Sequence, residues 1–189
     1  MNNIKTILIA LIVSTFFSFF FIIFLVLLVS NSSGGDSSIL VANYFKIPFE
    51  ADTLYTVTSE YGKRDNPLNN GKEEFHKGID LATNEGTNVL ASADGYVVAT
   101  GYDEGGFGNY VYIEHQFDGT TFYSIYGHML DDSIVVSNGE KVKQGDKIGC
   151  VGSTGVSTGF HLHFAITINK LSFEEKYLVD PSYVINGLN

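Results

Sequence analysis

The sequence predicts a mainly β domain with mostly antiparallel strands, preceded by one transmembrane helix. From about Asp52 onward, short runs rich in β-branched and aromatic residues alternate with glycine-containing turn signals. No long segment there shows the 3.6-residue period of an amphipathic helix, with the exception of part of Leu171–Leu178. Before this region, Ile7–Val29 is an uncharged apolar run of the length that membrane helices need.

The N-terminal run is predicted to be a membrane anchor. Ile7–Val29 would cross a hydrocarbon core of about 30 Å as a helix. Lys5 precedes it and the first charge beyond it is Asp36, so the positive-inside rule leaves residues 1–6 in the cytoplasm. The alternative is a cleaved secretory signal, whose apolar core usually has about 7–15 residues. Both alternatives place the remaining chain outside the cytoplasm.

Residues 30–50 are predicted to form a linker or stalk before a domain at residues 51–189. Ser30–Ser38 is small and polar, which is typical of a flexible tether. Ile39–Pro48 is apolar again, so it is either a strand of the domain or a stalk lying on it.

The domain contains six clear strand patterns and several turn signals. The predicted strands are Leu54–Ser59, Asn88–Ala91, Gly95–Thr100, Tyr110–His115, Thr120–Tyr126 and His161–Asn169. The turn signals are Asn70-Gly71, Asp94-Gly95, Asp118-Gly119 and Asn138-Gly139.

Composition excludes two classes of protein. The net charge is −10 and Arg64 is the only arginine, so no basic patch could neutralise nucleic-acid phosphates. We therefore expect no nucleic-acid partner. The single cysteine, Cys150, excludes an internal disulfide framework and any zinc site of the CxxC type.

Two histidines follow the glycine-rich loop Gly152–Gly159. His161 and His163 stand at the start of a predicted strand, where residues i and i+2 point to the same face. Such a pair suits a metal centre, with one imidazole on the ion and the other on its water. Two half-buried histidines on a sheet face are the alternative.

His76, Asp80 and His128 add to this pattern. A spacing of four places His76 and Asp80 on one face of a strand or helix, and Gly78 favours a strand or a turn into one. His128 ends another predicted strand, whereas His115 belongs to no ligand motif and is expected to be structural or exposed. A catalytic zinc takes three histidine or carboxylate ligands and keeps one position open for water.

These motifs occur together with several others in one order. They are Glu60-Tyr-Gly-Lys-Arg64, His76-Lys-Gly-Ile-Asp80, Gly86-Thr-Asn-Val89, Ala93-Asp-Gly95, Gly108-Asn-Tyr-Val111, Tyr126-Gly-His128, Val142-Lys-Gln-Gly145, His161-Leu-His163-Phe164 and Asp180-Pro181. From about Thr58 to Tyr183 the chain resembles the M23 family of zinc metallopeptidases, the lysostaphin and LytM-type peptidoglycan endopeptidases.

The resemblance implies a fold and a set of roles. The fold is a curled antiparallel β-sheet with a substrate groove along it. One zinc ion per domain would be bound by His76, Asp80 and His163. His128 and His161 would be the catalytic histidines, and which of them is the general base stays open. The chain departs from the family pattern at Phe160, where proline is common, and at Ala165, where glutamate is common.

The expected function is that of a cell-wall hydrolase of the bacterial cell membrane. A zinc-dependent endopeptidase, tethered by its N-terminal helix, would hydrolyse peptide bonds in peptidoglycan stem peptides or cross-bridges outside the cytoplasm. The alternative is a non-catalytic module that binds the wall or activates other cell-wall hydrolases. A protease acting on a glycine-rich protein is a third hypothesis.

Overall fold

The computed structural model describes residues 44–65, 71–186 and 188. The predicted anchor at residues 7–29 and most of the predicted linker lie outside this part of the chain. Among the described residues, no helix is long and apolar enough to cross a membrane. The compact unit that contains the described residues begins at Asn43 rather than at residue 51.

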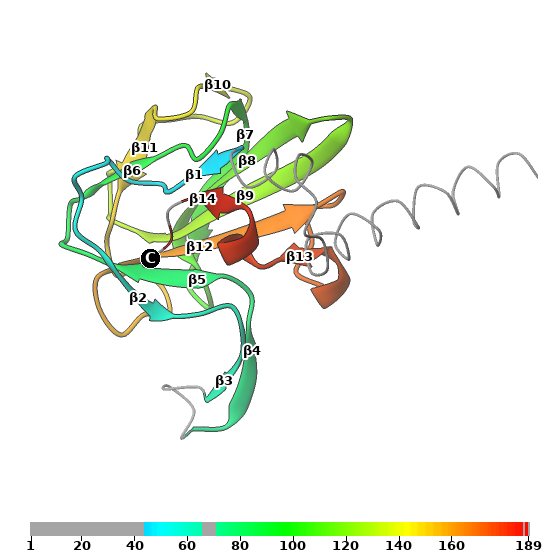
Figure 1. Cartoon of the computed structure of the whole chain (residues 1–189). Helices are drawn as coiled ribbons and strands as arrows, with labels where there is room; N and C mark the ends of the chain where they lie inside the picture. Colours follow the sequence, from blue (N-terminus) through cyan, green and yellow to red (C-terminus); the bar gives the residue numbers. More distant parts are fainter. Residues whose placement is uncertain (1–43, 66–70, 187, 189) are drawn as a thin grey trace, which may run out of the picture. The chain divides into compact units, whose positions relative to one another are not determined.

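An antiparallel sheet forms the body of this unit, with the strand order β10-β7-β8-β9-β12-β5-β2 and with β13 paired to β12 (Figure 1). Its strands are β2 Thr56–Ser59, β5 Ile79–Ala82, β7 Gly95–Asp103, β8 Gly108–Phe117, β9 Thr120–Met129, β10 Lys141–Val142, β12 His161–Ile168 and β13 Leu178–Val179. The prediction of a mainly β, mostly antiparallel domain is confirmed.

Three smaller strand pairs accompany this sheet in the described part of the chain. Antiparallel pairs join β3 (Gly62–Asp65) to β4 (Glu73–His76) and β6 (Asn88–Leu90) to β11 (Lys147–Cys150), whereas β1 (Phe45–Lys46) runs parallel to β14 (Ile185–Asn186). Two short 3-10 turns lie at Glu175–Tyr177 (η1) and Pro181–Tyr183 (η2).

All six predicted strands are present, and several are longer or shorter at their ends than predicted. The turn at Asp118-Gly119 joins β8 to β9, with φ values of 47° and 74° at the two residues. Two positive φ angles in a two-residue loop are what the right-handed twist of a hairpin requires. The partial helical period predicted at Leu171–Leu178 does not correspond to an α-helix, because a single 3-10 turn forms there before β13.

Strand β12 separates the core from the site. Leu162, Phe164 and Ile166 alternate along it and are completely buried in the hydrophobic core. Because side chains alternate between the two faces of a strand, His161 and His163 lie on the opposite face, as predicted from their spacing. The buried face therefore fixes the orientation of the histidine pair.

The segment before residue 51 is part of the folded unit. Phe45 in β1 is completely buried, and its ring lies 5.2 Å from the His115 ring and 5.7 Å from the Phe122 ring. Main-chain pairing of β1 with β14 joins this segment to the C-terminal end of the chain. Of the two alternatives for Ile39–Pro48, its described portion therefore contains a strand of the domain.

Replacing Phe45 by alanine is expected to destabilise the domain by about 3–5 kcal/mol, because it removes a fully buried aromatic side chain and leaves a cavity. Chemical denaturation of the full chain measures the effect. Lys46→Ala is the matched control in the same strand, since its side chain is exposed, and should change stability by less than about 0.5 kcal/mol. Equal stability of the two variants would contradict the structural role of β1.

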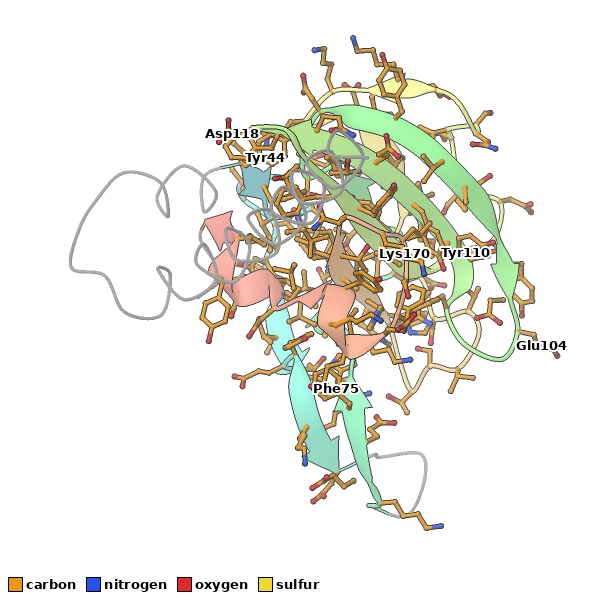
Figure 2. All side chains as sticks on the ribbon, turned by 90° about the vertical axis from the view of Figure 1, so that its right-hand side faces the viewer. Tyr44, Phe75, Glu104, Tyr110, Asp118 and Lys170 are labelled. Carbon is orange, nitrogen blue, oxygen red and sulfur yellow. The ribbon has the colours of Figure 1, made fainter. Side chains whose placement is uncertain are left out.

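The β3–β4 hairpin extends away from the main sheet, and Figure 2 labels Phe75 within it (Figures 1 and 2). Its register pairs Gly62 with His76 and Arg64 with Glu74. His76 is the last residue of β4. It therefore lies at the base of the hairpin, just before the chain enters β5 of the main sheet.

Candidate metal centre

Strand register brings two of the predicted ligands together. Asp80 in β5 and His163 in β12 are direct cross-strand partners. His76 ends β4, and the two residues Lys77-Gly78 lead from it into β5. The three residues are nearly buried, with exposed fractions of 5% for His76, 9% for Asp80 and 6% for His163, counted over the whole residue.

Three potential ligand atoms converge at this point. Oδ1 of Asp80 lies 2.9 Å from Nδ1 of His163 and 3.1 Å from Nε2 of His76, and these two nitrogens are 3.1 Å apart. Ligand atoms about 2.0–2.1 Å from a tetrahedral zinc lie about 3.3 Å from one another. The side chains of His76, Asp80 and His163 therefore fit one zinc ion after a small expansion.

A backbone carbonyl sets the tautomer of His76. Nδ1 of His76 lies 2.8 Å from the carbonyl oxygen of Glu60, which can only accept a hydrogen bond. The neutral ring therefore carries its proton on Nδ1, and the lone pair of Nε2 faces Asp80 and His163. Metal-binding histidines are commonly oriented by such a bond on the other ring nitrogen.

His163 faces the same point through Nδ1, whereas His76 does so through Nε2. Nδ1 of His163 faces Asp80, while its Nε2 is buried without a hydrogen-bond partner among the described residues. Burial lowers the pKa of His163 despite the hydrogen bond to Asp80, which favours the neutral ring that a metal requires.

Asp80 is the anionic member of the set. Burial by itself would raise its pKa, but the adjacent side chains of His163 and His76 outweigh burial and hold the pKa well below its usual range. Two imidazoles and one carboxylate make a donor set typical of zinc.

The other two predicted residues, His128 and His161, lie beside these ligands. Their rings are 4.6 Å apart between centroids, and Nε2 of His161 is 3.7 Å from Oδ1 of Asp80. The glycine-rich loop orients both rings, because Nδ1 of His128 donates to the carbonyl of Thr154 and Nδ1 of His161 to that of Gly159, each at 2.8 Å. In their neutral forms both therefore have a lone pair on Nε2.

The backbone of His128 is unusual. Its φ is 60°, a left-handed conformation that costs energy for a residue with a Cβ atom and often marks a functional site. Its N–H donates to the carbonyl of Phe107 at 2.6 Å. Burial, with a smaller contribution from nearby His161, lowers the pKa of His128 to about 4.

The fifth histidine lies elsewhere. His115 is completely buried, with Nδ1 donating to the carbonyl of Asp94 at 2.8 Å and Nε2 lying 2.7 Å from Oγ of Ser124. Burial lowers its pKa to about 4, so it is a neutral structural residue. Of the two expectations for His115, the structural one is confirmed.

The glycine-rich loop packs closely on the turn before β8. Gly155 has a φ of 69°, and a Cβ at this position would lie 2.3 Å from the backbone nitrogen of Gly108. This contact supports the interpretation that the glycines of the loop permit tight backbone bends beside the site.

Sequence reasoning missed the polar residues behind the ligands. Nη1 of Arg64 donates to Oδ2 of Asp80 at 3.2 Å and to Oγ of Ser59, and Oγ of Ser59 lies 3.2 Å from Nδ1 of His76. The signal that could have identified this group was the only arginine of the sequence, which ends the motif Glu60-Tyr-Gly-Lys-Arg64.

Replacing Gly78 by alanine is expected to weaken metal binding and activity by about 10–100-fold, the range for loss of a group that orients a ligand. A Cβ on Gly78 would lie 2.8 Å from Nε2 of His163 and 2.5 Å from the carbonyl oxygen of Phe164, so His163 would have to move. Metal competition and substrate turnover check this result. Gly159→Ala is the control, because nothing lies within 4 Å of its Cβ position.

The geometry defines a class of protein: a hydrolase-type metal centre with two histidines, one carboxylate and two further histidines, on an antiparallel sheet. Residues 74–175, more than half of the chain, match the family described as peptidase family M23. The chain belongs to this family, which contains zinc metallopeptidases and also non-catalytic relatives.

Two solved structures share the fold. The catalytic domain of lysostaphin from Staphylococcus simulans is 31% identical, with a TM-score of 0.58, and the match covers 78% of this chain and 96% of that one. A zinc-containing peptidase from Vibrio cholerae is 33% identical, with a TM-score of 0.59, over 74% of this chain and 39% of that one.

Two curated relatives differ in function. The DD-carboxypeptidase/endopeptidase Mpg of Neisseria meningitidis is 42% identical over 117 residues, which are 61% of this chain and 25% of the relative. The murein hydrolase activator NlpD of Escherichia coli is 42% identical over 94 residues, which are 50% of this chain and 23% of the relative. The chain thus spans a quarter or less of the length of these relatives.

Proposed function

We propose that this chain is a zinc-dependent endopeptidase that hydrolyses peptide bonds in peptidoglycan stem peptides or cross-bridges. One observation carries the proposal: His76, Asp80 and His163 place three ligand atoms within 3.1 Å of one another, with His128 and His161 beside them. A domain with only a binding role has no need of this complete set.

Zinc bound there would polarise the scissile carbonyl and lower the pKa of water toward 7, which supplies a nucleophile at neutral pH. His76, Asp80 and His163 would hold the ion through Nε2, Oδ1 and Nδ1. Three protein ligands would leave a position on the ion for water or substrate, and His128 and His161 lie beside these ligands.

His161 is the better candidate for the general base. A base works best when its pKa lies near the working pH, and a pKa of about 4 makes His128 a weak base at neutral pH. In the neutral state Nε2 of His128 can only accept a hydrogen bond, so it would orient the attacking water. Once protonated, either imidazole could donate to the oxyanion or to the leaving amine.

Two aromatic rings, those of Phe107 and Phe173, lie next to the metal centre and would line the substrate groove. The Phe107 ring lies 5.2 Å from the ring of His163 and 5.1 Å from that of Phe173, and Nζ of Lys77 lies 5.8 Å from the Phe173 centroid. We propose that these half-buried rings pack against the substrate peptide. Phe160, which is 48% exposed immediately before His161, would present a further apolar surface.

A second candidate function is activation of other cell-wall hydrolases without catalysis. The similarity to NlpD, a murein hydrolase activator, favours it. Its distinguishing feature would be function that survives loss of His161 or His163. The retained ligand set favours the enzyme.

We further propose that Ile7–Val29 anchors the domain to the bacterial cell membrane, with the domain outside the cytoplasm. The support is the uncharged apolar run between Lys5 and Asp36. Such an anchor would confine hydrolysis to wall within reach of the linker. A cleaved signal would instead release the domain, and the mass of the mature protein distinguishes the two.

Digestion of defined peptidoglycans tests the enzymatic function. The zinc-loaded full chain is incubated with walls that differ in their cross-bridges and in their diamino acid, and mass spectrometry identifies the products. New amino termini at one type of peptide bond are expected. If zinc-loaded protein releases no new amino groups from any of these walls, the proposed function is wrong.

A further inference from the structure

Arg64 connects the metal centre to the projecting hairpin. Its Nη1 donates to Oδ2 of Asp80 at 3.2 Å, and its Nε donates to Oε1 of Glu74 at 2.8 Å. The side chain is 27% exposed, and that of Asp80 is 12% exposed. Arg64 and Glu74 face each other directly in the β3–β4 register, so the ion pair is part of the hairpin itself.

The contact with Arg64 divides the two oxygens of Asp80 between different partners. Oδ1 faces the ligand nitrogens of His76 and His163, whereas Oδ2 faces the guanidinium of Arg64. A carboxylate without such a partner is free to rotate or to bind a metal with both oxygens. Both changes would disturb the open position that hydrolysis needs.

Arg64 also acts on a second ligand. Its Nη1 donates to Oγ of Ser59, and this hydroxyl lies 3.2 Å from Nδ1 of His76, beside the carbonyl of Glu60. One guanidinium therefore contacts one metal ligand directly and reaches another through a hydroxyl. The planar guanidinium has several donors in fixed directions, so Nη1 can make both contacts while Nε donates to Glu74.

The charge of Arg64 has an opposite effect, which Glu74 reduces. A cation close to a divalent metal ion repels it, and this repulsion alone would lower metal affinity. The carboxylate of Glu74, 2.8 Å from Nε, balances the guanidinium charge, so that orientation of Asp80 becomes the larger effect.

We propose that Arg64, held by Glu74, is a positioning residue that makes Asp80 a one-oxygen ligand. It thereby couples metal affinity to the β3–β4 hairpin. The proposal rests on the proposed zinc centre and does not require that the substrate be peptidoglycan.

Zinc competition with a chelator of known affinity, performed on the full chain, tests the proposal. Arg64→Gln should bind zinc about 10–100-fold more weakly, the range for loss of an outer partner of a ligand. Arg64→Lys should be intermediate, because one ammonium group cannot reproduce the fork of donors. X-ray absorption of the zinc-loaded Gln variant should show an added oxygen ligand from Asp80.

Lys63→Gln is the matched control. Lys63 precedes Arg64 in the same strand and forms an exposed ion pair with Glu73 at 3.1 Å, so its loss changes the charge equally. Its zinc affinity should stay within twofold of the parent chain. If the Gln variant of Arg64 does not fold, Glu74→Gln replaces it and should weaken zinc binding several-fold.

The possible outcomes distinguish failure of the Arg64 proposal from failure of the proposed zinc centre. Unchanged zinc affinity and coordination in the Arg64 and Glu74 variants, with zinc still bound by the parent chain, would overturn the role of Arg64 and leave the zinc centre intact. A lowered melting temperature without a change in zinc affinity would show a purely structural role and would also overturn it. A parent chain that binds no zinc would refute both the role and the proposed function.

Discussion

Replacing His163 by alanine is expected to abolish zinc binding and peptide hydrolysis together. His163 supplies one of three converging ligand atoms, and its partner across the strands is Asp80. Loss of a ligand should therefore lower zinc affinity by more than the ~10–100-fold that is typical when a residue hydrogen-bonded to a ligand is lost. Zinc content after dialysis and the rate of product release measure the two effects.

Thr167→Val is the control for this variant. Thr167 lies on the same face of β12 as His163 and is completely buried, and its Oγ1 has no partner among the described residues. The valine variant should keep zinc and activity. If the His163 variant retains stoichiometric zinc, the assignment of this ligand is wrong.

Replacing His161 by alanine is expected to lower kcat by about 10²–10⁴-fold while zinc remains bound, because general-base catalysis contributes that much. The ring lies beside the centre, 3.7 Å from Asp80, rather than among the three converging atoms. Turnover and zinc content of the same preparation check this prediction. Zinc loss equal to that of the His163 variant would instead identify His161 as a ligand.

His128→Ala provides the comparison. Both rings are oriented through Nδ1 by carbonyls of the glycine-rich loop, so geometry alone makes either one a proton acceptor. The low pKa of His128 favours His161 as the base, and the loss of kcat should then be larger for His161. The opposite order would exchange the two roles.

Much of the fold could be predicted because its long strands carry strong local signals. The strands Gly95–Asp103, Gly108–Phe117 and Thr120–Met129 are runs rich in β-branched and aromatic residues, and short turns separate them. The short strands Glu73–His76 and Ile79–Ala82 carry few such residues, and only a strand or a turn into one was predicted around Gly78, without bounds. Their pairing depends on neighbours distant in sequence, which local patterns do not contain.

The N-terminal strand shows the same limit. Composition alone could not decide whether Ile39–Pro48 is a strand or a stalk, because either would be apolar. Phe45 is a strand residue only because Ile185, 140 positions later, supplies its pairing partner. Long-range pairing of this kind appears only when the whole chain is folded.

The two-residue spacing of His161 and His163 left a metal centre and a pair of half-buried sheet histidines as alternatives, and the resemblance to the M23 family implied the ligand set. The side-chain alternation of a strand is a local property, so it can be read from the sequence. The roles of His76, Asp80, His128, His161 and His163 remain predictions that the geometry supports.

Only the tertiary structure decided how each residue presents its atoms. Nε2 of His76 but Nδ1 of His163 faces the centre, because Glu60 offers a carbonyl to one ring and Asp80 faces the other. Arg64 reaches Oδ2 of Asp80 because the β3–β4 pairing places it opposite Glu74, two residues before His76. Hydrogen bonds act over about 3 Å between groups far apart in sequence, so their partners exist only after the strands have paired.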